Sequence, residues 1–410
     1  MRILSITAQK PHSTGSGTYL TELVNSFDKT GHEQAVVCGL YPDDSVSFPC
    51  GVNVYPVLFS HEKNDEMQAC EAASLISYPI VGMSDTMPYP STRYRELTDN
   101  MIREFENSFI CAVDSAVSEF RPDIILCHHL FLLTSMVRKR YPDMTVYGLC
   151  HGSDLRQFIN CTHLQDRIRP EIAALDRIFA LHDEQKEKIY RLFGEECADK
   201  TFVIGSGYNA ALFNTDGRIE RSDDEPVRIS YAGKMSDAKG VPELLEVLEE
   251  LSSEHEYTAV LAGGCQDESI RSKLEKLPEN IKYRGQVPQS ELAAIFRSSD
   301  IFVLPSFYEG LPLVLIEAMA SGMLPISTDI PGTRDWINKN VSDPNVRYIP
   351  MPEMEAVDVP TRSGRENFKK DLKEILGAAI EDLSCGTCGE AARPDTSRIS
   401  WDAVAASIVR

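Results

Sequence analysis

The sequence predicts an α/β fold built from two doubly wound domains in tandem. A chain of 410 residues is longer than one hydrophobic core usually organises, so two domains are expected. Short apolar runs of strand length alternate with segments of helical periodicity in both halves, which is typical of parallel sheets covered on both faces. A polar stretch at residues 214–225 has the composition of a linker. We therefore predict an N-terminal domain at residues 1–213 and a C-terminal domain at residues 214–394.

The first half contains seven apolar runs from which we predict strands, at residues 3–7, 34–40, 52–59, 123–127, 144–150, 177–181 and 201–204. A helix follows the first of these, because Leu20, Leu23, Val24 and Phe27 recur at the spacing of one helical face. Residues 92–120 predict a long helix. Residues 60–91 break the alternation and match neither pattern.

In the second half we predict strands at residues 227–232, 257–262, 281–283, 301–304 and 324–327. Helices lie between them, including residues 241–251 and 313–321. An amphipathic helix within residues 395–410 ends the chain, and it either closes the second domain or returns to the first. Ligands of doubly wound sheets bind beyond the carboxyl ends of the strands, so with two domains we expect the site in a cleft between them.

Composition and net charge limit the classes of binding partner and the cellular location that we expect. The net charge of -21 disfavours a nucleic-acid partner and docking on anionic lipid, since both need basic surface. The chain has no leader pattern, and no run approaches the ~20 apolar residues of a membrane span, so we expect a cytoplasmic protein. Eleven scattered cysteines are typical of reduced thiols. The pair Cys385 and Cys388 has metal-ligand spacing but lacks a second pair, so we predict no metal site.

A glycine loop follows the first predicted strand. Gly15 and Gly17 would let a phosphate approach the backbone at the start of a helix, where N–H groups and a positive dipole end attract anions. The G-x-G-x-x-G pattern is not completed, because Leu20 stands at its last position. A flexible turn explains this loop equally well.

Histidines end two predicted strands. His151 follows the strand at residues 144–150 and is well placed to hydrogen-bond a ligand hydroxyl; the alternative is a loop histidine capped by Asp154. His128 and His129 end the preceding strand. Neighbours in a strand point to opposite sides, so we do not expect this pair to bind a metal.

Two lysines follow the first strand of the second domain. Lys234 and Lys239 lie in a loop bounded by Gly233 and Gly240, just before a helix start. Such a loop suits a diphosphate, although solvated lysines are the ordinary alternative. The run Leu261-Ala-Gly-Gly264 ends the next strand and indicates another close approach of the backbone.

The most informative run spans residues 305–322. Glu309 lies in a strand-to-helix loop, and Gly310 and Leu311 would present N–H groups at the start of a helix that tolerates Pro312. Glu317 lies about one and a half turns inside that helix, among apolar residues. A carboxylate there needs a partner, and a ribose diol offers two O–H donors.

This run, Glu309-x7-Glu317 with Gly310-Leu311-Pro312 between, resembles the signature of family 4 retaining glycosyltransferases (glycosyl transferases group 1) of the GT-B fold. The resemblance extends over nearly the whole chain and implies two Rossmann-like domains facing across a cleft. Weaker matches lie at residues 15–18, 122–125, 151, 203–213, 233–240, 284–288 and 400–401. Three departures are the Lys at position 234 in place of Arg, the Ser at position 16, and Gly205-Ser206-Gly207 at the opening of the linker.

The resemblance implies a role for each matched residue. Glu317 would hold the nucleotide ribose, and Glu309 would contact the donor sugar with help from the N–H groups of Gly310 and Leu311. Lys239 would neutralise the diphosphate, and His151 would contact the sugar, so His151, Glu309 and Lys239 are the expected catalytic residues. Further donor contacts are expected from Gly15, Gly17, Gly233, Lys234, Gly264 and Val287.

The implied activity is retaining transfer of a hexose-type sugar from a nucleotide sugar, with UDP the expected nucleotide, to an acceptor hydroxyl by front-face attack. No metal or other cofactor is expected. The acceptor, whether saccharide, small molecule or protein, is not identified, and residues 83–93 are our prediction for its recognition. Two alternatives share the architecture: a sugar-nucleotide epimerase, and a non-catalytic sugar-nucleotide-binding partner.

Overall fold

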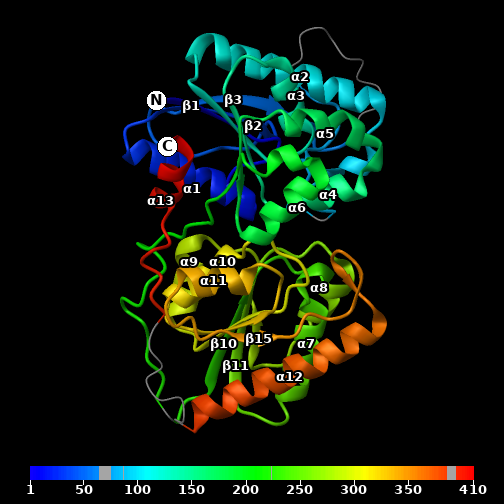
Figure 1. Ribbon diagram of the computed structural model, residues 1–410. Helices are drawn as coiled ribbons and strands as arrows, with labels where there is room; N and C mark the ends of the chain where they lie inside the picture. Colours follow the sequence, from blue (N-terminus) through cyan, green and yellow to red (C-terminus); the bar gives the residue numbers. More distant parts are fainter. Residues whose placement is uncertain (64–74, 86, 223, 386–393) are drawn as a thin grey trace. The chain divides into compact units, whose positions relative to one another are not determined.

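The computed structural model describes residues 1–63, 75–85, 87–222, 224–385 and 394–410. Contacts within the chain divide it into two units (Figure 1). Unit 1 contains Met1–Ser206 and Trp401–Arg410, and unit 2 contains Gly207–Ser400. Cys388 of the predicted cysteine pair, Thr86 of the predicted acceptor segment and residue 223 of the predicted linker lie outside the described residues.

Unit 1 is built on a seven-stranded parallel sheet. In the order in which they pair, the strands are β3 (Asn53–Leu58), β2 (Glu33–Leu40), β1 (Arg2–Ile6), β6 (Ile124–His128), β7 (Val146–Leu149), β8 (Arg177–Ala180) and β9 (Thr201–Val203). The inner strands are buried almost without interruption, as expected for a sheet covered on both faces. Their bounds lie within about two residues of the predicted ones, because continuous apolar runs reveal such strands directly.

The helices of unit 1 are α1 (Gly15–Lys29), α2 (Asp99–Phe120), α3 (Leu132–Arg140), α4 (Ser153–Asn160), α5 (Gln165–Ala173), α6 (Asp183–Phe193) and α13 (Trp401–Val409). The final helix α13 returns to α1, where Ser26 donates a hydrogen bond to Asp402 at 2.6 Å (Figure 1). Three 3-10 turns are η1 (Tyr94–Glu96), η2 (Thr162–Leu164) and η3 (Glu195–Cys197).

The predicted long helix at residues 92–120 is wrong in its first seven residues. Thr92 and Arg93 form the short strand β5 (Thr92–Arg93), which pairs in parallel with β4 (Val81–Gly82). The helix begins only at Asp99, because Thr98 is extended and its hydroxyl accepts a hydrogen bond from the N–H of Met101, a standard N-cap.

Unit 2 is built on a six-stranded parallel sheet. Its strands, in pairing order, are β12 (Ile281–Tyr283), β11 (Tyr257–Ala262), β10 (Val227–Ala232), β13 (Ile301–Leu304), β14 (Leu324–Thr328) and β15 (Arg347–Ile349). The chain runs outward from β10 to β12 and then restarts beside β10 with β13. The predicted strands agree with this sheet, and β15 is an addition.

The helices of unit 2 are α7 (Val241–Leu251), α8 (Glu268–Leu274), α9 (Gln289–Arg297), α10 (Leu313–Ala320), α11 (Thr333–Asn340) and α12 (Arg362–Ser384). A 3-10 turn, η4 (Asp237–Lys239), precedes α7, and a small hairpin of β16 (Met354–Ala356) and β17 (Val359–Pro360) precedes α12. The long helix α12 packs against α7 (Figure 1). Lys369 and Lys373 of α12 pair with Glu246 and Glu250 of α7.

Each unit has its own hydrophobic core between sheet and helices. None of the helices in the described part of the chain combines the length and apolar character that crossing a bilayer requires.

Candidate functional site

The order of strands in unit 2 identifies the edge at which a ligand would bind. The chain order reverses between the neighbouring strands β10 and β13. Loops that leave the carboxyl ends of two such strands diverge to opposite sides of the sheet and leave a crevice, the usual ligand site of doubly wound sheets. Here those loops are residues 233–240 and 305–312, which carry the lysines and Glu309.

The two loops touch each other directly. Gly240 has φ +62°, and a Cβ built on it would lie 2.1 Å from the carbonyl oxygen of Pro305, so only glycine fits there. The N–H of Phe307 donates to the carbonyl of Ala238 at 3.0 Å. The path of each loop therefore depends on the other.

The structure brings together two of the three predicted catalytic residues, Lys239 and Glu309. The Lys239 ammonium lies 2.6 Å from Glu309 Oε1 and donates to the carbonyl of Tyr308 at 3.1 Å. The hydroxyl of Ser306 donates to the same Oε1 at 2.8 Å. Both charged side chains are about one-fifth exposed, so the pair is partly shielded from water yet reachable by a ligand.

Helix α10 contributes Glu317 and a positive dipole end. Glu317 is 7% exposed in a helix whose other residues are all apolar. Pro312 is the N-cap, so α10 begins at Leu313 as predicted, and no side chain caps this end. The N-terminus of α7, whose N-cap is Gly240, likewise has no side-chain cap. Two helix N-termini therefore lie at this edge, where they favour a negative charge.

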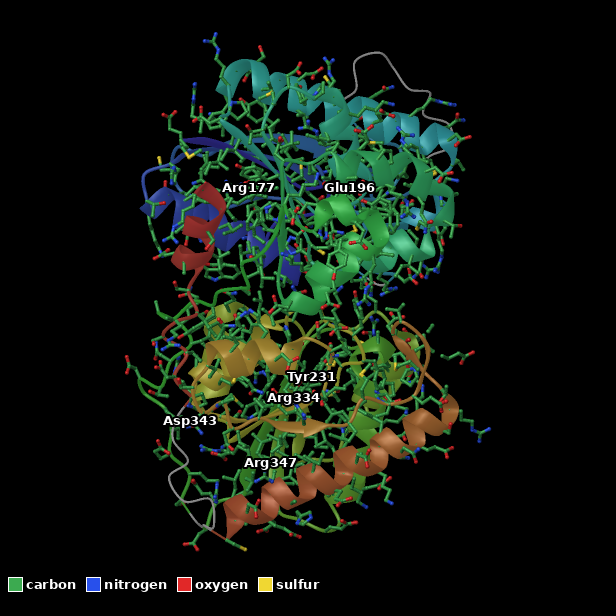
Figure 2. All side chains as sticks on the ribbon, in the orientation of Figure 1. Arg177, Glu196, Tyr231, Arg334, Asp343 and Arg347 are labelled. Atoms are coloured by element: carbon green, nitrogen blue, oxygen red, sulfur yellow. The ribbon has the colours of Figure 1, made fainter. Side chains whose placement is uncertain are left out.

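Glycines shape the neighbouring loops. A Cβ on Gly233 would lie 2.7 Å from the hydroxyl of Tyr231, which donates to the carbonyl of Lys234. Figure 2 labels Tyr231 within unit 2. A Cβ on Gly263 would lie 1.7 Å from the carbonyl oxygen of Gly233, whereas one on Gly264 would meet nothing nearer than 3.8 Å. Within the run at residues 261–264, where a close backbone approach was expected, the tight contact is made by Gly263.

Gly264 nevertheless holds the adjacent loop, because its carbonyl accepts from the N–H of Met235 at 2.9 Å. Val287, another predicted donor residue of unit 2, is half-buried and lies four residues beyond the end of β12. Burial, together with the nearby charge of Glu309, raises the pKa of Tyr231 well above its ordinary value. Tyr231 therefore stays neutral and donates its hydrogen bond at any physiological pH.

In unit 1, Gly15 and Gly17 lie within the first turn of α1 rather than in a loop before it. The N–H of Gly17 donates to the hydroxyl of its N-cap, Thr14, at 3.1 Å. A Cβ on Gly17 would lie 2.8 Å from the carbonyl oxygen of Lys10, so this glycine permits the preceding loop to pack closely. The structure thus gives Gly17 a local partner and a packing role.

The prediction that His128 and His129 point to opposite sides is wrong. His129 has φ +74°, which breaks the alternation of a strand. His128 Nδ1 and His151 Nε2 share a hydrogen bond of 3.1 Å, and the rings of His128 and His129 lie 5.3 and 4.7 Å from that of His151. The edge of Tyr19 from α1 packs on His151, with the ring centroids 5.1 Å apart.

Sequence reasoning missed this histidine cluster. The available signal was that β6 and β7 are neighbours, so residues that follow them lie side by side. Asp154 holds the loop, as the alternative interpretation of His151 expected, and accepts from the N–H groups of Leu130 at 2.7 Å and His151 at 3.3 Å.

Burial makes these imidazoles neutral. It lowers the pKa of His128 and of His129 to about 3. Burial and the two neighbouring rings lower the pKa of His151 well below its usual value. Within the described residues, both ring nitrogens of His129 and the Nε2 of His128 have no hydrogen-bond partner. The cluster can donate or accept hydrogen bonds at neutral pH but carries no positive charge.

The predicted acceptor segment, residues 83–93, is largely packed into the core of unit 1. Met83, Met87 and Tyr89 are buried. The carbonyl of Met83 accepts from the side chain of Gln157 on α4, the helix that follows His151. The segment therefore adjoins the histidine loop through α4 and exposes few of its own side chains.

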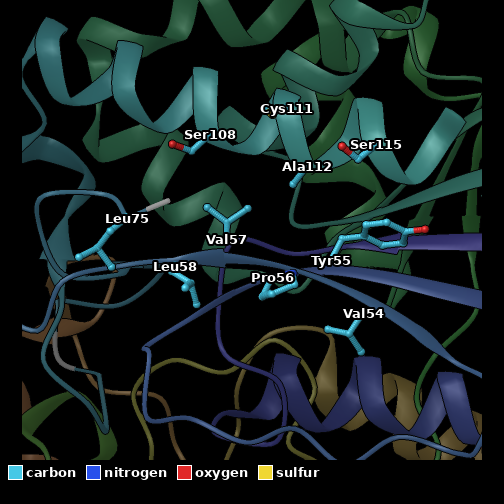
Figure 3. A pocket seen from close by; sticks show the side chains of 10 residues that line it. All are labelled: Val54, Tyr55, Pro56, Val57, Leu58, Leu75, Ser108, Cys111, Ala112 and Ser115. Carbon is cyan, nitrogen blue, oxygen red and sulfur yellow. The ribbon is translucent and has the colours of Figure 1, made fainter. Parts of the chain in front are cut away.

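A separate hollow of about 260 Å³ lies between strand β3 and helix α2 (Figure 3). Its lining includes Tyr55 and Val57 from β3, and Ser108 and Cys111 from α2. None of the predicted site residues lines it. Among the described residues, no group of three or more His, Cys, Asp or Glu side chains is arranged to hold a metal ion.

The sequence of unit 2 matches a known family. The family model described as glycosyl transferases group 1 covers residues 213–349, which include both site loops and Glu317. The amylovoran biosynthesis glycosyltransferase of Erwinia amylovora is 23% identical over 368 residues, covering 83% of this chain and 86% of that protein. Residues 213–349 therefore match the glycosyl transferases group 1 family, and the two comparisons together support a group 1 glycosyltransferase.

Other relatives match over shorter stretches. The teichuronic acid biosynthesis glycosyltransferase TuaC of Bacillus subtilis, named as putative, is 34% identical over 156 residues, covering 37% of this chain and 38% of that protein. Glycogen synthase of Mycobacterium tuberculosis is 29% identical over 161 residues, and the match spans 38% of each protein. This chain therefore covers well under half of the length of these two relatives.

Solved structures establish the fold. Sucrose-phosphate synthase from Thermosynechococcus elongatus superposes with a TM-score of 0.69 at 16% identity, over 100% of this chain and 97% of that one. Anabaena HepE in complex with UDP and glucose gives a TM-score of 0.62 at 13% identity, over 100% and 98%. The chain has the GT-B fold, with two Rossmann-like units.

Proposed function

We propose that this protein is a retaining glycosyltransferase that moves a hexose-type sugar from a nucleotide-sugar donor, with UDP as the expected nucleotide, to an acceptor hydroxyl. The observation that carries the proposal is the convergence of Lys239, Glu309 and Ser306 at the switch point of the unit 2 sheet, between the N-termini of α7 and α10. A diphosphate and the hydroxyls of a sugar are the ligand groups that this combination of charges suits.

The proposed donor contacts follow from these positions. Glu317 is a buried carboxylate about one turn from the start of α10, which suits the two hydroxyls of a ribose. Lys239 already contacts Glu309, so a diphosphate that draws the ammonium toward itself leaves Glu309 to accept from sugar hydroxyls. The base would lie toward Val287, at the end of β12.

In the proposed reaction, the bond between the sugar C1 and the diphosphate oxygen breaks while a bond from C1 to the acceptor oxygen forms on the same face. The acceptor proton leaves with the departing phosphate. Lys239, Lys234 and the two helix N-termini stabilise the charge that develops on the diphosphate, so we propose a reaction that needs no metal ion. The neutral His151 hydrogen-bonds the donor sugar and stays unprotonated.

Two structural relatives guide the choice of donor. Anabaena HepE is described in complex with UDP-glucose, and starch synthase IV of Arabidopsis thaliana is described bound to ADP. We therefore propose UDP-sugars first and ADP-sugars second. We also propose a cytoplasmic location, in which the nine described free cysteines would stay reduced.

The test is an assay of the purified chain with UDP-, ADP- and GDP-sugars, with and without a saccharide acceptor panel, in EDTA and in Mg²⁺. We expect one nucleotide to be released with formation of a glycosylated product of retained configuration, at rates that EDTA does not lower. Epimerised donor without transfer would support the alternative enzyme, and binding without turnover would support a non-catalytic partner. Either result would overturn the proposal.

Replacing Glu317 by Ala should weaken binding of the same nucleotide by about 10- to 100-fold, as expected for losing hydrogen bonds to a charged group. Glu317→Gln keeps the shape and one acceptor oxygen, so it should lose less. Isothermal titration measures both affinities. Unchanged affinity of Glu317→Ala would remove the ribose role.

A further inference from the structure

One arginine outside the matched motifs contacts both loops of the candidate site. Arg365 Nη1 donates to Asp237 Oδ1 at 2.9 Å and to Glu243 Oε1 at 2.6 Å, and its Nη2 donates to Asp237 Oδ2. Its guanidinium also lies 5.5 Å from the ring centroid of Phe307. Asp237 is two residues from Lys239, and Phe307 is two residues from Glu309. The arginine therefore joins the backbones that carry the two predicted catalytic residues of unit 2.

The start of α12 is built to place this side chain. Thr361 caps the helix by accepting from the N–H of Gly364 at 3.0 Å, and its own N–H donates to the carbonyl of Glu353 at 2.8 Å. A Cβ on Gly364 would lie 2.5 Å from that carbonyl oxygen. The ring of Phe368, one turn on, packs against Phe307. The first turn of α12 is thus held tightly against the segment that begins the β16–β17 hairpin and against the 305–312 loop.

The contacts of Arg365 also affect the net charge around the 233–240 loop. Lys234 and Lys239 provide two positive charges, but Asp237 and Glu243 provide two negative ones within the same stretch. Glu243 is 7% exposed and lies in the first turn of α7, whose N-terminus faces the proposed diphosphate. Without Arg365, both carboxylates would repel an anion at this edge.

We propose that Arg365 is a positioning residue of the donor site: it compensates the charges of Asp237 and Glu243 and fixes the 233–240 and 305–312 loops against each other, so that Lys239 and Glu309 meet a diphosphate donor in a fixed geometry. The proposal rests on the proposed function. Arg365 lies 128 positions after Asp237, so no local sequence pattern indicates that the two residues are in contact.

The experiment compares Arg365→Met with a matched control, Lys369→Met, on the same helix. Lys369 pairs with Glu246 and Glu250 of α7, so its loss removes an ion pair between the same two helices without touching either loop. Titration calorimetry would measure the affinity of each full-length variant for the nucleoside diphosphate and monophosphate of the base that the wild-type chain prefers.

We expect Arg365→Met to weaken diphosphate binding on the order of tenfold, and monophosphate binding less, because repulsion grows with ligand charge. Lys369→Met should bind both like the wild type. Arg365→Lys should bind the diphosphate almost as tightly as the wild type, because lysine restores the positive charge. Its kcat should stay below that of the wild type, because lysine lacks the guanidinium fork that spans the two carboxylates. Adding Asp237→Asn to Arg365→Met should also recover affinity.

Two results would overturn the role of Arg365: equal affinities of Arg365→Met and Lys369→Met, or an equal loss for diphosphate and monophosphate. If Arg365→Met does not fold, Arg365→Lys alone decides, because unchanged kcat and KM in that variant contradict the positioning role. Failure of the wild-type chain to bind any nucleoside diphosphate would instead overturn the proposed function and this inference together.

Discussion

Burial sets the charge of the histidines at the end of β6, and this makes the stability of unit 1 depend on pH. In the folded state His128 and His129 stay neutral down to about pH 3, whereas in the unfolded chain they gain protons below about pH 6.5. The unfolded state then binds more protons than the folded state between these values. The stabilisation is therefore complete above pH 6.5 and is lost as the pH falls.

We expect the free energy of unfolding of unit 1 to decrease by about 1.4 kcal/mol per pH unit for each ring below pH 6.5. His129→Asn should make this dependence shallower, and asparagine tolerates the positive φ at this position. The sequence contains two tryptophans, so in a Trp336→Phe background the fluorescence of Trp401 reports urea unfolding of unit 1 alone. An identical slope in the variant between pH 7 and pH 4.5 would contradict a neutral buried ring.

At the scale of elements, α13 links the end of the chain to the histidine cluster. Trp401 is buried and packs edge-on against Tyr19, with ring centroids 4.7 Å apart, and Tyr19 in turn packs on His151. The hydroxyl of Tyr19 donates to the carbonyl of Gly205 at 2.9 Å. A helix from the C-terminus thereby supports a side chain that orients a predicted catalytic residue.

Trp401→Ala should lower the free energy of unfolding of unit 1 by about 3–5 kcal/mol, the usual cost of emptying a large buried site. Asp402→Ala is the control, because it removes only the hydrogen bond from Ser26 and should cost about 1 kcal/mol. Scanning calorimetry measures both. Equal costs would mean that α13 is held by its polar contact rather than by Trp401.

The elements that sequence could predict are those whose signal is local. β10, β11, β12 and β13 have the predicted bounds. β10, β11 and β13 are mostly apolar and largely buried, whereas β12 is an edge strand in which only Ile281 is buried. β15 was not predicted, because it is only three residues long and begins with Arg347. The helix at residues 92–120 was extended too far, because tertiary pairing of Thr92 with Val81 overrides its helical pattern.

The residues of the candidate site likewise fall into those with a local sequence signal and those that only the fold brings together. Glu309 and Glu317 lie on one continuous loop and helix, so their spacing could be read directly from the sequence. The cluster of His128, His129 and His151 depends on strand adjacency and on one positive φ, and Arg365 depends on how α12 packs. Contacts between distant segments require the fold, and a single sequence does not provide it.

For the whole molecule, the two units contribute unequally to what is shared with relatives. The family model lies within unit 2, and the Bacillus relative matches over 156 residues only. This division is expected if unit 2 binds the nucleotide and diphosphate, which different donors have in common. Unit 1, with its histidine cluster and the segment at residues 83–93, would then determine the acceptor.

This division predicts where ligands slow hydrogen exchange. A nucleoside diphosphate alone should protect backbone amides in residues 233–243 and 306–315 of unit 2, because its phosphates meet the helix N-termini there. The amide of Gly17 already donates to Thr14, so the diphosphate alone should leave the first turn of α1 unchanged. If His151 contacts the sugar as proposed, the complete nucleotide sugar should add protection at residues 151–154. Mass spectrometry of peptides from the full chain resolves these segments. Protection by the diphosphate in unit 1 but not in unit 2 would reverse the proposed roles of the two units.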